Sequence, residues 1–350
     1  MAAMDFAAER ILKLKYWLKN ALCLVRAASP ALVAGVVLLG CSPARPPAAN
    51  EPRPFKLGYL SGAQDFVIFV MESEGLLERY RLRPEKVKFL NPPSVHLMIA
   101  ERQVDIGFGG FTTMANARAQ GKDVIVVRGI FSPVNVVFVP WDSPLKSVAD
   151  LKGKKLGSFG GLGSTTLAFL AVIASKWHGL DLYREVEQIT APGPALDQLL
   201  ERGEIDAALM GTMESIQLAA QKKYRVLVDL SEEYQKNQGR APAHVTVSTS
   251  EEFAREHPEI IRDFLRAYQD ALEYSRTNAG VWARYGKTVG IESEAAIALL
   301  REKMSANLIE QWDAAQLETQ QEYLRFVLSV LGPREFGAIP EGLLRNDFNP

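Results

Sequence analysis

The feature that most constrains the fold is an alternation of short apolar strands and helical segments that occurs twice along the chain. The first run predicts strands at 56–60, 87–90, 104–108 and 124–127. The second run predicts strands at 155–159, 186–189, 205–210 and 225–228. Strands that alternate with helices form mainly parallel sheets. The sequence therefore predicts an α/β protein with two lobes of about 100 residues, each a mainly parallel sheet flanked by helices.

The alternation stops after one more predicted strand, 244–248, and only helical patterns follow. Helices without new strands must pack on a lobe that is already built, and we expect them mainly on the first. Lobe 1 is then residues 55–139 plus 245–350, and lobe 2 is residues 140–244. The chain would cross between the lobes near Pro140 and His244, which predicts a hinge beside a cleft.

The N-terminus is typical of an export signal. Five basic residues, four of them at 13, 15, 19 and 26, precede an apolar stretch at 27–40, whose 14 residues are fewer than the roughly 20 that span a bilayer as a helix. The stretch ends in Leu38-Leu39-Gly40-Cys41, which resembles the bacterial lipobox. That resemblance implies a signal peptide at 1–40, a diacylated Cys41 and a Pro-rich tether at 41–54. A weakly inserted helix with an incidental cysteine is the alternative.

Composition and spacing exclude several classes of protein. The chain has 40 Lys and Arg against 41 Asp and Glu, so it lacks the basic excess of a nucleic-acid-binding protein. Its two cysteines, Cys23 and Cys41, leave the body without thiolate ligands, and its four histidines do not pair at metal-ligand spacing. Neither a Ser-His-Asp arrangement nor paired carboxylates can be identified. We therefore expect a binding protein and not an enzyme, without a metal or cofactor.

The turns that follow the predicted strands hold the candidate ligand-binding residues, because ligands of open α/β sheets bind at the carboxyl ends of the strands. The most informative is Gly160-Gly161-Leu162-Gly163-Ser164-Thr165-Thr166, which enters an apolar helix. Its glycines allow close approach of a ligand, and Gly163, Ser164 and Thr165 offer donors to an anion at a helix start. Ser164 or Thr165 serving only as a helix cap is the alternative.

Three further turns supply the other candidates, which are Gln64, Asp65, Phe66, Phe111, Thr112 and Glu214. Asp65 is favoured in a first helical turn whatever the function, and Phe111 suits a core equally well. Two carboxylates facing the cleft would repel an anion and favour an amino or heterocyclic N–H group. This conflicts with the anion expected at Ser164, so the sequence leaves the ligand undecided.

Specific motifs identify a family resemblance. The run Asp-Leu-Lys-Gly-Lys-Lys at 150–155 leads into a strand and then a Gly-Ser-Thr turn, with Gly-Glu-Ile-Asp-Ala at 203–207 and His-Pro-Glu at 257–259 further on. Together they resemble type II periplasmic binding proteins of ABC transporters, in the branch that serves nitrate, alkanesulfonates, taurine and thiamine-pyrimidine precursors. The resemblance covers most of residues 55–330.

The resemblance implies a function. Two lobes would close on a small organic solute (a sulfonate, nitrate-like ion, carboxylate or pyrimidine) and deliver it to an ABC permease and its ATPase. It implies a monomer in the periplasm or at the cell surface, held to the membrane through Cys41. Eukaryotic pyrimidine-precursor synthases share the fold but carry a Cys-rich motif that is missing here. A ligand-sensing receptor and, less favoured, such a synthase remain the alternatives.

Overall fold

A computed structural model describes residues 51–60 and 64–350, and residues 51–350 form one compact unit. The predicted signal peptide, Cys41 and residues 41–50 of the tether lie outside the described residues. The tether was predicted two residues too long, because Arg53 and Pro54 pair with Leu82 and Arg83 in the first sheet. Within the described part of the chain, no helix is long and apolar enough to cross a bilayer.

The first sheet of the described residues has five strands in the order β2-β1-β3-β10-β4. They are β1 (Arg53–Leu60), β2 (Leu82–Phe89), β3 (Ile106–Gly110), β4 (Ile125–Phe131) and β10 (Val245–Thr249). Strand β1 pairs in parallel with β2 and β3, whereas β10 runs antiparallel to both β3 and β4. Four of the five strands therefore point the same way, as predicted for a mainly parallel sheet.

The second sheet of the described residues repeats this arrangement, in the order β7-β6-β8-β5-β9. Its strands are β5 (Val136–Val139), β6 (Lys155–Ser158), β7 (Glu187–Thr190), β8 (Ala207–Leu209) and β9 (Arg225–Asp229). Strand β6 pairs in parallel with β7 and β8, and the antiparallel strand is β5. In each sheet the antiparallel strand lies in the fourth place of the order.

The antiparallel strands mark where the chain passes between the sheets. After β4 it runs through 132–135 into β5, and after the second sheet it runs through 239–244 into β10. The predicted lobe boundary at Pro140 is wrong by several residues, because Val136–Val139 pairs with β8 and β9 and not with the first sheet. The misplacement arose because this short apolar strand was not predicted and Pro140 was the more visible break.

The helices of the first sheet are α2 (Asp65–Ser73), α3 (Leu76–Arg79), α4 (Pro92–Ala100) and α5 (Phe111–Ala119). Gly75 adopts a left-handed conformation (φ 64°) and separates α2 from α3. Helix α4 is capped by Asn91, whose side chain accepts from the Ser94 amide (3.0 Å).

The helices of the second sheet are α6 (Thr165–His178), α7 (Leu182–Glu185), α8 (Gly193–Glu201), α9 (Thr212–Gln221) and α10 (Leu230–Gln238). Helix α6 begins where predicted, because Ser164 Oγ accepts from the Leu167 amide (3.1 Å). It ends at Gly179, whose φ of 62° is the left-handed value that closes many helices. Helix α10 was not predicted from the sequence.

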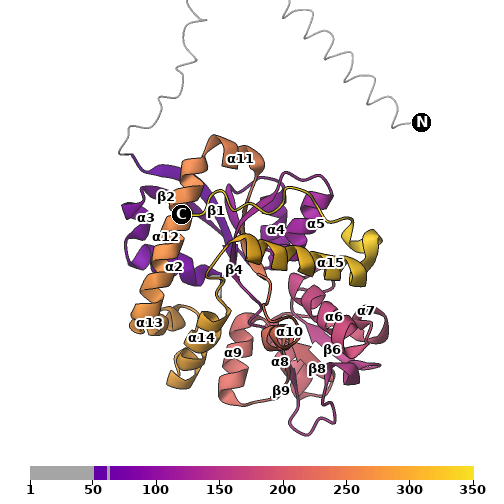
Figure 1. Cartoon of the computed structure of the whole chain (residues 1–350). Coiled ribbons are helices and arrows are strands. Elements are labelled where there is room, and N and C mark those ends of the chain that lie inside the picture. The colour runs from indigo at the N-terminus through magenta and orange to yellow at the C-terminus, as the bar shows by residue number, and fades with distance from the viewer. Residues whose placement is uncertain (1–50, 61–63) are drawn as a thin grey trace, which may run out of the picture. The chain divides into compact units, whose positions relative to one another are not determined.

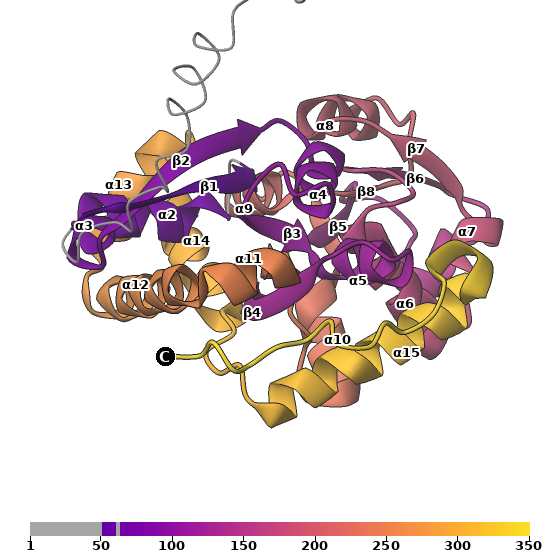
Figure 2. The ribbon, with the colours of Figure 1, turned by 90° about the horizontal axis from the view of Figure 1, so that it is seen from above.

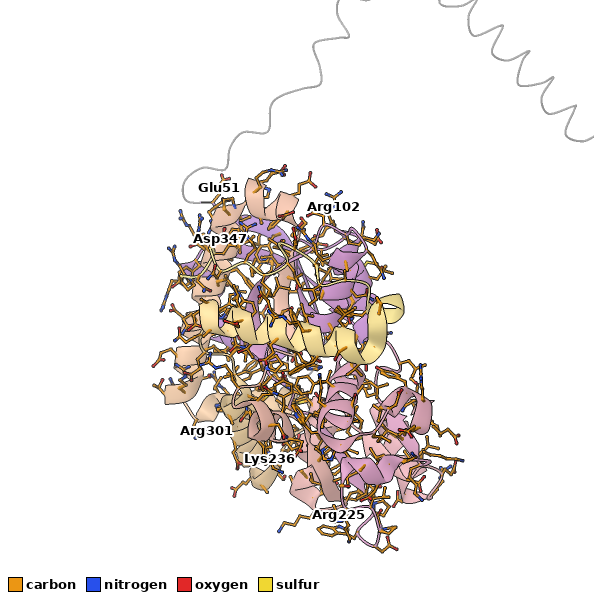
Figure 3. The ribbon with its side chains drawn as sticks, turned by 45° about the vertical axis from the view of Figure 1, so that its right-hand side comes forward. Glu51, Arg102, Arg225, Lys236, Arg301 and Asp347 are labelled. Carbon is orange, nitrogen blue, oxygen red and sulfur yellow. The ribbon has the colours of Figure 1, made fainter. Side chains whose placement is uncertain are left out.

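The C-terminal helices are α11 (Glu251–Glu256), α12 (Pro258–Thr277), α13 (Gly280–Thr288), α14 (Glu294–Asn307) and α15 (Ala314–Phe336). Helix α12 packs against α2 and α3, but α14 packs against α9 and α15 against α6 (Figures 1 and 2). Figure 3 shows α15 from the side, crossing the middle of the molecule. The prediction that the tail packs mainly on lobe 1 therefore holds for α12 but not for α14, and α15 contacts α5 of the first sheet as well as α6 of the second. An amphipathic pattern shows which face is buried, but not which sheet buries it.

Candidate functional site

The two sheets enclose a cleft at the ends of their strands, with a volume of about 400 Å³. We call it the inter-sheet cleft. Its lining comes from Leu60, Gln64, Lys88, Phe89, Leu90, Pro92, Phe131, Asn135, Phe159, Thr166, Gly211, Thr212, Met213, Glu214, His244, Val245 and Val289. Apart from Val289, which follows α13, these residues belong to the ends of β1, β2, β4, β6 and β8 and the turns after them, to the two crossings and to the start of β10. Both sheets therefore contribute the carboxyl ends of strands, where α/β proteins bind ligands.

The walls of the inter-sheet cleft are largely apolar and partly aromatic. Phe89 and Phe131 come from the first sheet and Phe159 from the second. The charged side chains of its lining are Lys88, which is exposed, and Glu214, which is half-buried. Apolar walls with a few polar groups are typical of sites for small organic molecules.

Glu214 lies in the first turn of α9, packed closely against two glycines. A Cβ added to Gly193 or Gly211 would lie 2.6 Å from one of its carboxylate oxygens, so a side chain at either position would displace the carboxylate from this place. The two glycines stand at the N-terminal ends of α8 and α9, whose dipoles favour a negative charge. Among the described residues, the Glu214 carboxylate has neither a hydrogen bond nor an ion pair.

Two buried side chains of the cleft, Asn135 and His244, each have a polar atom without a partner among the described residues. The Asn135 amide nitrogen donates to the Met210 carbonyl (2.9 Å), which leaves its Oδ1 unpaired. His244 Nε2 lies 3.0 Å from Thr166 Oγ1, and its Nδ1 is the unpaired atom. Burial, together with the neighbouring His96, lowers the pKa of His244 to about 3, so its ring is neutral near pH 7.

Helices α5 and α6 contact each other next to Thr166, which lines the cleft. Thr112 Oγ1 donates to Thr165 Oγ1 (3.0 Å), and Thr113 Oγ1 lies 3.2 Å from the same oxygen. Gly110 stands at the start of α5, and a Cβ there would lie 2.2 Å from Thr165 Oγ1. The N-terminal ends of the two helices therefore touch directly, and we call this contact the threonine wall (Thr112, Thr113 and Thr165).

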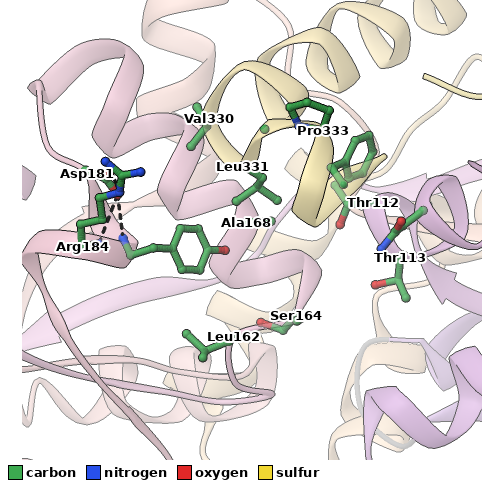
Figure 4. A pocket seen from close by; sticks show the side chains of 15 residues that line it. Thr112, Thr113, Leu162, Ser164, Ala168, Asp181, Arg184, Val330, Leu331 and Pro333 are labelled. Atoms are coloured by element: carbon green, nitrogen blue, oxygen red, sulfur yellow. Dashed lines mark hydrogen bonds and ion pairs between the residues drawn. The ribbon is translucent and has the colours of Figure 1, made fainter. Parts of the chain in front are cut away.

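A larger cavity of about 710 Å³ lies between α5, α6, α7 and the end of α15, and we call it the α15 cavity. In Figure 4, Thr112 and Thr113 lie on one side of it and the Asp181–Arg184 pair on the other, with Val330, Leu331 and Pro333 from α15. Helix α15 bends here at Gly332, whose φ of 77° and ψ of 166° are not helical. Arg184 and Asp181 form an exposed ion pair with an N–O distance of 3.5 Å.

The structure separates the predicted site residues into groups. Gln64 and Glu214 line the inter-sheet cleft, where Gln64 Oε1 accepts from the Leu60 amide (3.2 Å). Gly163 and Ser164 line the α15 cavity instead. Thr165 is buried in the threonine wall, and Thr112 belongs to both the wall and the α15 cavity. The predicted turns thus do not converge on one site.

Three other predicted site residues, Asp65, Phe66 and Phe111, contact other parts of the protein and do not line the inter-sheet cleft. Phe66 is fully buried and stacks on Trp282 with ring centroids 4.1 Å apart, so its prediction as a cleft residue is wrong. Phe111 is also fully buried, in the core between the sheets, and that prediction is wrong too. Asp65 accepts a 2.5 Å hydrogen bond from the hydroxyl of Tyr285. Phe66 and Phe111 follow strand ends in the sequence, but both belong to the buried faces of their helices.

Sequence reasoning missed Asn135, Thr166 and His244 as cleft residues. Thr166 follows the predicted Ser164 and Thr165, and the three neighbouring hydroxyls have different surroundings: Ser164 caps α6, Thr165 joins the wall and Thr166 bonds His244. His244 stood at a predicted crossing between lobes, which was a usable signal. Asn135 gave none, because strand β5 beside it was not predicted.

Comparison with known proteins agrees with this fold. The protein-family model described as NMT1/THI5 like matches residues 85–279. A Haemophilus influenzae protein named for thiamine biosynthesis is 26% identical, over 51% of this chain and 56% of its own length. The Saccharomyces cerevisiae 4-amino-5-hydroxymethyl-2-methylpyrimidine phosphate synthase THI12 is 24% identical, over 59% of this chain and 62% of its own. The matches thus span little more than half of these relatives.

A solved structure extends the likeness to nearly the whole described chain. The alkanesulfonate-binding protein SsuA from Xanthomonas axonopodis pv. citri, bound to MOPS, superposes with a TM-score of 0.70 at 19% identity, covering 85% of this chain and all of SsuA. At that identity the likeness shows a shared fold, which is that of a periplasmic binding protein. The predicted family resemblance is confirmed: because the family model spans more than half of its residues, the chain belongs to the NMT1/THI5-like family.

Proposed function

We propose that this protein is an extracytoplasmic substrate-binding lipoprotein of an ABC importer, which captures a small organic solute in the inter-sheet cleft. The observation that carries the proposal is the cleft itself, where strand ends of two matching sheets surround buried polar atoms that have no partner among the described residues. Such atoms are costly to bury unpaired, and a solute can pair them. The shared fold with SsuA supports the same reading.

We propose Gln64 and Glu214 as solute-contacting residues, because they are the predicted site residues that line the inter-sheet cleft. The unpaired Glu214 carboxylate favours a solute with an N–H group over a plain anion. Phe89, Phe131 and Phe159 suit a flat or apolar body. Sulfonates, nitrate-like ions, carboxylates and pyrimidines all remain to be compared by experiment.

The two crossings at 132–135 and 239–244 are proposed as the hinge between lobe 1 and lobe 2. In an open form the cleft admits solute, and contacts made by both sheets then stabilise a closed form. Small-angle scattering tests this step, because a bound solute should reduce the radius of gyration. An unchanged radius at saturating solute would contradict closure.

We also propose that Cys41 carries the lipid anchor that keeps the protein at the membrane as a monomer beside its permease and ATPase. Changing Cys41 to Ala in the full-length protein should move it from the membrane fraction to the soluble fraction. If the Cys41→Ala protein stays at the membrane, the proposed anchor is wrong, but the proposal of solute binding is not affected.

A thermal-stability screen tests the binding function. Residues 42–350 contain the complete compact unit and are assayed with propanesulfonate, MOPS, nitrate, benzoate and 4-aminopyrimidine. A solute at 100 times its Kd stabilises the protein by about 2.7 kcal/mol, which raises the melting temperature measurably. Absence of a shift with every solute would contradict the proposal and favour the alternative of a receptor or, given the yeast relatives, a synthase.

A further inference from the structure

The two crossing segments lie side by side at the floor of the inter-sheet cleft. The His244 amide donates to the Phe131 carbonyl (2.8 Å), and the His244 carbonyl accepts from the Phe111 amide (2.9 Å). Each crossing places one buried polar side chain on the cleft lining, Asn135 from the first (3% exposed) and His244 from the second (8% exposed). The floor of the cleft is therefore built from the proposed hinge itself.

Each of the two side chains is held in place through one of its nitrogen atoms, Nδ2 of Asn135 and Nε2 of His244. The Asn135 side-chain amide donates to the Met210 carbonyl at the end of β8, and the Asn135 backbone carbonyl accepts from the Leu230 amide (3.2 Å). His244 binds α6 through Thr166. These partners all belong to the second sheet and its helices, so the two side chains tie the crossings to that side of the cleft.

The second polar atom of each side chain, Asn135 Oδ1 or His244 Nδ1, has no hydrogen-bond partner among the described residues. Eight buried side-chain atoms in the described residues have no partner, and of the residues that carry them only Asn135 and His244 line the inter-sheet cleft. Asn135 Oδ1 can only accept a hydrogen bond, whereas Nδ1 of a neutral His244 donates or accepts according to its tautomer. Neither atom carries charge, so this floor suits an uncharged polar edge.

We propose that Asn135 Oδ1 and His244 Nδ1 bind an uncharged hydrogen-bonding edge of the solute, such as an amide or amidine with at least one N–H donor. The inference rests on the proposed function and names the chemistry of the same cleft. Because both residues stand on the crossings, a solute that bridges them also fixes the hinge. Glu214 then contacts a different part of the solute, at the start of α9.

Isosteric variants of His244 test this assignment. His244→Gln places an amide near the position of Nε2, so it keeps the contact to Thr166 and loses the group at Nδ1, whereas His244→Asn does the reverse. We use residues 42–350 and measure the Kd of 4-aminopyrimidine, which has an amidine edge, by calorimetry. His244→Gln and Asn135→Ala should each raise this Kd about 10- to 100-fold, and His244→Asn should keep it within threefold. Ser158→Ala is the control, since it removes another buried unpaired atom outside the cleft lining.

The outcomes separate this inference from the proposed function. If Asn135→Ala and His244→Gln both keep the Kd of 4-aminopyrimidine within threefold, the inference is wrong and the function stands. It is also wrong if the unaltered protein binds propanesulfonate but not 4-aminopyrimidine. If no solute of the panel binds, the function fails and the inference with it.

A measurement on the protein without substitutions tests the same inference if the variants do not fold. The ¹⁵N chemical shift of His244 Nδ1 should move when 4-aminopyrimidine is added, and the shift of His96 should move less because its Nε2 already accepts from the Gly110 amide (2.8 Å). An unchanged His244 resonance at saturation would overturn the inference.

Discussion

The inter-sheet cleft and the α15 cavity differ in the polar groups that they offer to a ligand. The α15 cavity is the larger, at about 710 Å³ against 400 Å³. Its ion pair is exposed, and its serine is already used to cap α6. The smaller cleft contains the buried unpaired atoms of Asn135 and His244.

This difference teaches that volume is a weak guide to a binding site in this molecule. A cavity whose polar groups already have partners, or are in contact with water, gains little from a ligand. A cleft with fixed, buried and unpaired polar groups binds a matching ligand more strongly, because those groups already lost their contacts with water when the protein folded. The larger predicted effects concern the threonine wall, and the smallest concerns the α15 cavity.

The largest expected loss of stability is at Phe111, which precedes Thr112 and Thr113 in α5. Phe111 begins α5 and is fully buried near Tyr323 of α15, with ring centroids 6.3 Å apart. Phe111→Ala should reduce the free energy of unfolding by about 3–5 kcal/mol, measured by urea denaturation. A loss below about 1 kcal/mol would show that Phe111 is not part of the core and would restore it as a cleft residue.

Acid should weaken the protein through two buried histidines beside the wall. Burial lowers the pKa of His96 to about 4 and that of His244 to about 3, both below the ordinary 6.5. Below pH 6.5 the unfolded chain therefore takes up protons that the folded chain does not. The free energy of unfolding should fall by up to about 1.4 kcal/mol per pH unit for each histidine. Urea denaturation between pH 7 and 5 measures the slope, and His96→Gln should reduce it; equal slopes for both proteins would contradict the assignment.

Forcing the wall apart gives a smaller effect. Gly110→Ala places a Cβ 2.2 Å from Thr165 Oγ1, so the Thr165 side chain or the two helices must shift. We expect a loss of about 1–3 kcal/mol in the free energy of unfolding. Gly163→Ala is the matched control, because a Cβ at Gly163 meets nothing within 4 Å. Equal free energies of unfolding for the two variants would show that Thr165 moves away from the added Cβ without a cost in stability.

Removing the shared hydroxyl of the wall should cost less. Thr165→Val keeps the shape of the side chain but loses the oxygen that Thr112 and Thr113 contact. We expect about 1–2 kcal/mol, since each hydrogen bond contributes about 0.5–1.5 kcal/mol. In the Thr112→Val background the same change should cost clearly less. Full additivity of the two changes would contradict a direct contact.

The smallest effect is expected at the rim of the α15 cavity. Arg184 is 88% exposed in its ion pair with Asp181. Arg184→Ala should change the free energy of unfolding by less than about 0.5 kcal/mol, as for most exposed pairs. A loss above about 1 kcal/mol, or weaker solute binding, would show that the cavity has a larger role than this comparison allows.

Much of the fold was predictable because its signals are local. Alternating strands and helices, the start of α6 at Ser164 and the family motif at 150–155 could all be read from the sequence. The elements that were missed have weaker local signals. Strand β5 has four residues before a proline, and α10 is polar along most of its length.

The site was less predictable because it depends on contacts between distant segments. Glu214 and Gln64 line the cleft as expected, but Phe66 faces Trp282, more than 200 residues away in the sequence. The direction of a side chain on a helix depends on which neighbour buries it. Asn135 matters only because β5 joins the second sheet, a pairing that no local pattern indicates.

One measurement tests most directly whether the inter-sheet cleft, and not the α15 cavity, is the binding site. Thr212 begins α9 and lines the cleft, whereas Asn116 lies within α5 and lines the α15 cavity, and both residues are half-buried. Calorimetry with the solute identified in the screen compares Thr212→Trp with Asn116→Trp, each of which fills one space. The account predicts at least 100-fold weaker binding for Thr212→Trp and a change within threefold for Asn116→Trp. The reverse result would contradict it and place the solute beneath α15.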